Sequence, residues 1–126
     1  MPDHSRAPVV DAGLVALGGA AGSLARWGLE EGVPGPWGTL AANVSGCFLI
    51  GLLAAWLFVR HSRLRLLLGV GLLGGYTTFS THLLDAHDLI GEPLGAAAYV
   101  GGSLVGCLLA AAVGLVLGRR LPGATT

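Results

Sequence analysis

Lysine is absent from this 126-residue chain, and charged residues of any kind are scarce. Only 11% of the residues are charged, against roughly 25% in a typical soluble domain. The net charge is zero, so no basic surface indicates a nucleic-acid partner. Cysteine is equally rare, because Cys47 and Cys107 stand alone in apolar runs, without the spacing of a zinc site or a disulfide framework. We interpret both as small packing residues.

Long uncharged runs dominate what remains. No charge occurs between residues 36 and 60, or from 94 to 118, and a spanning helix needs about 20 apolar residues. Backbone groups in hydrocarbon must pair within their own segment, so each apolar run is predicted to be a helix. The sequence therefore predicts an all-α membrane protein, a single four-helix transmembrane domain over residues 1–126. The predicted helices cover about residues 12–29, 37–59, 66–90 and 94–117.

The first of these runs is the shortest, and it could instead be the apolar core of a signal peptide. Asp3 and Asp11 precede it, however, and they do not suit the basic start of such a peptide. We therefore keep it as a spanning helix. The connections between runs are short, so neighbouring helices should be antiparallel, with both termini on one side of the membrane.

Arginine is distributed unevenly between the two predicted sides. Arg26 lies opposite the termini, whereas the side of the termini holds the others: Arg6, Arg60, Arg63, Arg65, Arg119 and Arg120. Cytoplasmic loops of membrane proteins carry such an excess. We predict a multi-pass cell-membrane protein whose termini face the cytoplasm.

Glycine is abundant, with 22 residues spread through the apolar runs. Small residues let helices in lipid approach closely, so we interpret these glycines as packing residues. Small residues recur at intervals of four, which places them on one helix face: Gly18 and Gly22, Gly71 and Gly75, and the fourth-run series Gly102, Gly106, Ala110, Gly114 and Gly118.

Polar side chains also recur every fourth residue in two of the runs, as Thr39, Asn43 and Cys47 and as Tyr99, Ser103 and Cys107. Polar groups at membrane depth tend to face protein or a watery path. Each set is compatible with a pore lining. It is equally compatible with an interhelical hydrogen bond from Asn43, or with a Ser103 hydroxyl bonded to its own helix.

The third run holds the densest polar cluster, residues 74–82. Its paired glycines each weaken a helix by roughly 1 kcal/mol relative to alanine, and threonines follow, so we predict a break in mid-membrane. Freed carbonyls suit a small cation, and hydroxyls and amide hydrogens suit an anion; a kink without a ligand is the alternative. His82 lies near Ser80 and Thr81, but no buried acid orients it, so no enzyme is predicted.

Three stretches carry a family resemblance: GGAAGSLAR at residues 18–26, GTLAANVSGCF at 38–48 and GGYTTFST at 74–81. With them the chain resembles the Fluc (CrcB) fluoride channels. The resemblance implies an antiparallel dimer with two pores, passive fluoride efflux that relieves toxicity, and a structural sodium ion that is not transported. It implies that backbone carbonyls of Gly74 and Thr77 hold the sodium.

The resemblance also assigns side chains to the anion path and its mouth. The path residues it implies are the amide of Asn43, the ring edge of Phe79, the hydroxyls of Ser80 and Thr81, and the polar track of Tyr99 and Ser103. Arg26 at the end of the first helix and Asp85 near the pore mouth complete the set.

Two features depart from the family pattern. His82 stands where a second phenylalanine is usual, and an imidazole can become charged near neutral pH. It either lines a pH-sensitive pore or marks a silent one. The arginine bias predicts one fixed orientation and favours a separately encoded, inverted partner, with a homodimer as the alternative. Two alternative functions remain. One is a small-cation antiporter of the four-helix dual-topology type, which a carboxylate buried in the first helix would favour. The other is a non-conducting assembly subunit.

Overall fold

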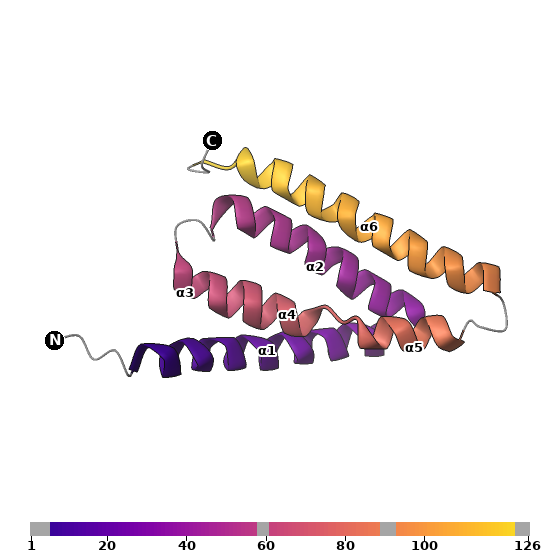
Figure 1. Ribbon diagram of the computed structural model, residues 1–126, viewed down its shortest axis with the longest axis horizontal. Coiled ribbons are helices and arrows are strands. Elements are labelled where there is room, and N and C mark those ends of the chain that lie inside the picture. Colours follow the sequence, from indigo (N-terminus) through magenta and orange to yellow (C-terminus); the bar gives the residue numbers. More distant parts are fainter. Residues whose placement is uncertain (1–5, 58–60, 89–92, 123–126) are drawn as a thin grey trace.

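The computed structural model describes residues 6–57, 61–88 and 93–122 (Figure 1). It is all-helical in these ranges, as predicted. Three helices are long and apolar enough to cross a membrane. They are α1 (Arg6–Gly32), α2 (Pro36–Trp56) and α6 (Pro93–Arg119). The first helix begins earlier than the apolar run, and the predicted ends at residues 59 and 90 lie outside the described residues.

The third segment is a chain of short helical pieces, and its predicted break is confirmed. The pieces are α3 (Ser62–Leu64), η1 (Arg65–Leu73), α4 (Gly74–Tyr76) and α5 (Ser80–Asp88). Helix α4 ends where Thr77 turns extended, with φ −82° and ψ 150°. Piece η1 is a π-helix, in which the Gly74 N–H reaches back to the Gly69 carbonyl. The sequence did not predict this widened helix.

The four segments pack as two parallel pairs. Helix α1 lies along η1 and α4, and α2 lies along α6 (Figure 1). Consecutive segments alternate in direction along the chain. The first segment packs against the third and the second against the fourth, so the two members of each pair run in the same direction. Helix α1 begins, and α6 ends, at the same end of the molecule (Figure 1).

Glycines bring the backbones of each pair into contact. A Cβ at Gly22 of α1 would overlap the Leu72 carbonyl group, and one at Gly114 of α6 would overlap the Phe48 carbonyl oxygen. The predicted packing role is therefore right for these stripes. It is wrong for Gly102 within this chain, where an added Cβ would meet no atom of the described residues. The fourth-run stripe packs only along its later half.

Candidate functional site

A cavity of about 450 Å³ lies between α2, the broken third segment and α6. Six of the residues predicted to form the site line it: Asn43, Gly74, Thr77, Phe79, His82 and Ser103. The remaining five predicted residues do not line the cavity. They are Arg26, Ser80, Thr81, Asp85 and Tyr99. The structure thus gathers residues from α2, α5 and α6 around the interruption of the third segment.

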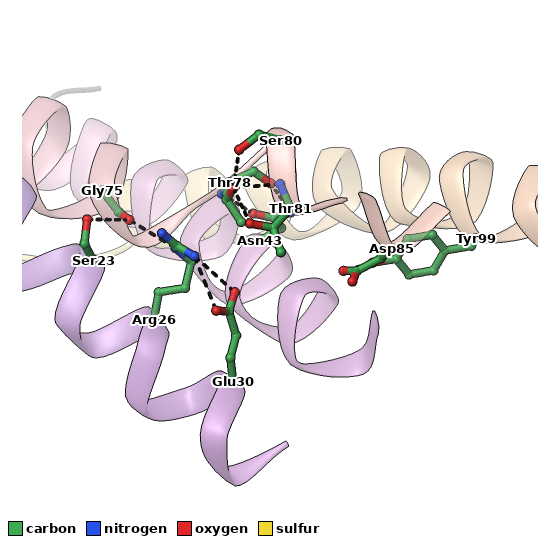
Figure 2. Close-up of polar contacts among 10 residues, drawn as sticks. All are labelled: Ser23, Arg26, Glu30, Asn43, Gly75, Thr78, Ser80, Thr81, Asp85 and Tyr99. Atoms are coloured by element: carbon green, nitrogen blue, oxygen red, sulfur yellow. Dashed lines mark hydrogen bonds and ion pairs between the residues drawn. The ribbon is translucent and has the colours of Figure 1, made fainter. Parts of the chain in front are cut away.

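Asn43 holds the extended part of the break (Figure 2). Its Nδ2 donates to the Thr78 carbonyl oxygen at 2.9 Å, and its Oδ1 accepts from the Thr78 N–H at 2.8 Å. Both backbone groups that Thr78 loses from the helix ladder are thereby satisfied, as burial in a membrane requires. The interhelical hydrogen bond left open by the sequence is real, and one Nδ2 hydrogen remains available because an amide has two.

Helix α1 holds the other side of the break. The Gly75 carbonyl oxygen accepts from Ser23 Oγ and from Arg26 Nε, each at 3.4 Å (Figure 2). Arg26 Nη1 also lies 3.3 Å from both carboxylate oxygens of Glu30, one turn along α1. The guanidinium is therefore paired, and its charge is compensated while it fixes the end of α4.

The hydroxyls after the break organise the start of α5. Thr78 Oγ1 accepts from the Thr81 N–H at 3.3 Å and donates to Thr81 Oγ1 at 3.1 Å. It also lies 3.4 Å from Ser80 Oγ. Thr78 lies two residues before α5, and its hydroxyl satisfies one of the free N–H groups at the start of that helix. Among the described residues, nothing accepts the hydroxyl hydrogen of Thr81, so it can serve another acceptor.

Two carbonyl groups of the break have no partner within the described residues. Thr77 directs its N–H and its hydroxyl to the Leu73 carbonyl, at 3.0 and 2.9 Å. No described residue donates to the carbonyl oxygens of Gly74 or Thr77, and Gly74 is exposed. Unpartnered carbonyl oxygens are ligands that hard cations prefer, so the two residues predicted for sodium fit that role.

His82, Tyr99 and Asp85 form a cluster between α5 and α6. The His82 ring is 6% exposed and lies 4.7 Å from the Tyr99 ring, centre to centre. The Tyr99 hydroxyl is 3.1 Å from the Pro36 carbonyl oxygen and 3.3 Å from Asp85 Oδ2, so it donates to either acceptor. His82 Nδ1 is buried and has no hydrogen-bond partner among the described residues. The imidazole is thus held by stacking rather than by hydrogen bonds at this nitrogen.

Ser103 and Phe79 differ in how far their side chains are buried within the chain. Ser103 is buried and donates to the Tyr99 carbonyl of its own helix. This is the alternative that spacing alone left open. Phe79, in contrast, is 74% exposed, and its ring packs little against its own chain.

Sequence reasoning missed the partners of the break. Ser23 and Thr78 both lie in the stretches that carry the resemblance, yet neither was assigned a role. The polar type of each residue was the only signal in the sequence. Their partners are 52 and 35 residues away, a distance that periodicity within a helix does not reveal.

The family described as CrcB-like protein, Camphor Resistance (CrcB), matches residues 13–115. The chain belongs to the CrcB family. Among CrcB relatives, the fluoride-specific ion channel FluC of Rhizobium etli is 46% identical, over 90% of this chain and 99% of its own length. FluC 1 of Rhodococcus jostii is 48% identical over 85% and 84%. FluC of Paracoccus denitrificans is 48% identical over 85% and 93%.

Proposed function

We propose that this CrcB chain is a subunit of a fluoride-specific channel, through which fluoride leaves the cytoplasm passively and its toxicity is relieved. It is a multi-pass membrane protein and not an enzyme. The observation that carries the proposal is similarity over nearly the whole chain to proteins named as fluoride-specific channels. A broken third segment lined by uncharged donors supports it.

The anion path in this proposal runs along the cavity at the break and past the start of α5 and the Tyr99 side chain beside it. The free Nδ2 hydrogen of Asn43, the ring edge of Phe79 and the hydroxyls of Ser80 and Thr81 are its donors. The edge of an aromatic ring is positive in the quadrupole sense. Neutral donors replace part of the hydration shell of a small anion without holding it permanently, and conduction requires such a balance. Further along, His82, Tyr99 and Ser103 line the path, with Asp85 at its mouth.

An antiparallel partner supplies the second wall of this path. Phe79 supports this view because 74% of its surface is uncovered in the single chain, although it stands in the middle of a membrane segment. Gly74 is exposed beside it. The partner is a second copy or a separately encoded homologue. The arginines of α3, η1 and α6 support cytoplasmic termini.

A structural sodium ion belongs to the same proposal. The carbonyl oxygens of Gly74 and Thr77 would hold it, because no described residue donates to them. The ion would supply positive charge that offsets the carbonyl dipoles where two broken segments meet, and it would not be transported. Each chain offers two carbonyl groups, so a pair of chains offers four.

Fluoride efflux from liposomes tests the function. The purified chain is reconstituted alone and with an oppositely inserting homologue, and released fluoride is followed with a selective electrode. We expect efflux far above that of protein-free liposomes, little chloride efflux, and loss of activity when sodium is replaced by a large organic cation.

Phe79→Ile should reduce fluoride efflux at least tenfold, because it removes the ring edge. Phe48→Ile is the matched control, since Phe48 lies on α2 outside the cavity lining. Absence of fluoride efflux from both reconstitutions would contradict the channel function. Equal effects of the two substitutions would contradict the path past Phe79.

A further inference from the structure

The parallel contact of α2 with α6 places two thiols side by side. Gly51 of α2 meets Ala111 of α6 so closely that a Cβ at Gly51 would overlap the Ala111 carbonyl oxygen. Cys47 and Cys107 each lie four residues earlier in these helices. Residues four apart share a helix face, and the two helices run in the same direction. The register therefore brings the two cysteines opposite each other, one turn from a backbone contact.

Both thiols belong to the same cavity wall. Cys47 and Cys107 line the cavity at the break, and neither is in a disulfide. They had been interpreted as packing residues. As a facing pair in a cavity, they form a dithiol that bridges α2 and α6.

We propose that Cys47 and Cys107 form a two-coordinate site for a soft divalent cation of the Hg²⁺ class. Thiolates are the ligands that soft metals select. Binding converts two thiols and one Hg²⁺ into a neutral dithiolate complex and releases two protons. A neutral complex suits an apolar wall, whereas a monovalent cation would leave a net negative charge, which is costly to bury.

Metals that need more ligands do not fit this site. Structural zinc is bound by four ligands as a rule. No cluster of three or more histidine, cysteine or acidic side chains occurs in the ranges that the structure describes. Selectivity for two-coordinate cations follows from this shortage of further ligands.

Metal binding closes the anion path, a consequence that depends on the proposed function. Cys47 lies one turn from Asn43 on α2, and Cys107 lies one turn from Ser103 on α6. A cation bridging them crosses the wall of the cavity and locks the two helices together. We expect Hg²⁺ to stop fluoride efflux, and an excess of a small dithiol to restore it.

Metal retention tests the site without reference to transport. The detergent-purified full chain is incubated with Hg²⁺, passed through a column containing a monothiol competitor, and analysed for mercury by elemental mass spectrometry. We expect one mercury per wild-type chain and none in Cys47→Ser or Cys107→Ser, because a single thiolate exchanges with the competitor. Retention by either variant, or any other wild-type stoichiometry, would overturn the site.

A second probe requires no substitution, so it does not depend on the folding of variants. Phenylarsine oxide condenses with two neighbouring thiols to a cyclic dithioarsinite and one water. In the wild-type chain it should form one adduct per chain and protect both cysteines from alkylation by iodoacetamide. Alkylation of either cysteine in the treated chain would contradict the dithiol.

The efflux assay then separates the two proposals. Inhibition by Hg²⁺ is measured as a fraction of each variant's own rate, and we expect it to fall at least tenfold in both serine variants. If mercury is retained but no chain conducts fluoride, the proposed function fails and the metal site stands. If the wild type conducts and Hg²⁺ inhibits the serine variants equally, the metal site is not the point of block.

Discussion

Asn43 pairs with the backbone of Thr78 through both ends of its amide, Nδ2 to the carbonyl oxygen at 2.9 Å and Oδ1 to the N–H at 2.8 Å. The contact joins α2 to the extended part of the third segment. It is thus a connection between the two helix pairs of the molecule. The same side chain lines the cavity, so the fold and the proposed anion path depend on one residue.

Asn43→Asp tests this connection with almost no change of shape. The carboxylate still accepts from the Thr78 N–H but repels the Thr78 carbonyl oxygen, so we expect a loss of about 1–3 kcal/mol in stability and loss of fluoride efflux. The measurement is thermal unfolding in detergent together with liposome efflux. Ser45→Ala, on the same helix as Asn43, is the control, because it removes a 3.0 Å bond to the Tyr76 hydroxyl of α4 without touching Thr78. Equal effects would count against a special role of Asn43.

Gly22→Ala tests the backbone contact between α1 and the third segment. A Cβ there overlaps the Leu72 carbonyl group, and both partners are backbone, so the helices must separate. Overpacking of this kind costs about 1–3 kcal/mol or more. Gly28→Ala in the same helix meets no atom of the described chain and should leave stability unchanged or raised. The readout is the melting temperature of the purified protein, and similar values for the two variants would contradict the contact.

Tyr99→Phe separates the two functions of the tyrosine. The ring still stacks on His82 at 4.7 Å, but the hydroxyl no longer reaches Pro36 or Asp85. We expect a loss of about 1 kcal/mol in stability and a several-fold fall in efflux. Asp85→Asn should have a smaller effect, since the amide oxygen still accepts from Tyr99. An efflux rate for Tyr99→Phe equal to that of the wild type would show that the hydroxyl is not part of the path.

His82 makes fluoride efflux depend on pH if it lines a conducting path. Its titratable neighbours are Tyr99 of α6 and, through the Tyr99 hydroxyl, Asp85. An imidazole can become charged near neutral pH, and a charge beside the path would change how an anion passes it. Efflux measured between about pH 5.5 and about pH 8 should therefore vary with pH. Protein-free liposomes at each pH give the leak to subtract. His82→Phe should give a flat profile, and an equally flat wild-type profile would reject the role.

The break could be predicted from composition because its cause is local. Gly74, Gly75 and the threonines that follow lower helix stability wherever they occur. The widened η1 could not be predicted, since Gly69 and Gly71 look like ordinary packing glycines. The sequence also did not show which helices pack against each other. Gly22 and Gly114 show that their helices pack closely, but they do not show against which segment.

Site residues divide in the same way. Asn43 was identified because an amide in a spanning helix needs partners, yet those partners proved to be the backbone of Thr78. Ser103 occupies the same kind of position, but its bond stays within its own helix. Polar residues with the same spacing thus make different hydrogen bonds, one to another segment and one within its own helix. Only the relative placement of the helices distinguishes the two cases.

The pairing of each helix with the next but one also governs how the chain assembles during synthesis. When α1 enters the bilayer, its glycine face stays uncovered until the third segment is inserted. The glycine face of α2 likewise stays uncovered until α6 is inserted. Each pair therefore closes only after an intervening helix has been inserted. Chains that stop before α6 should be recognised by quality-control proteases, because an unmatched glycine surface remains in the lipid.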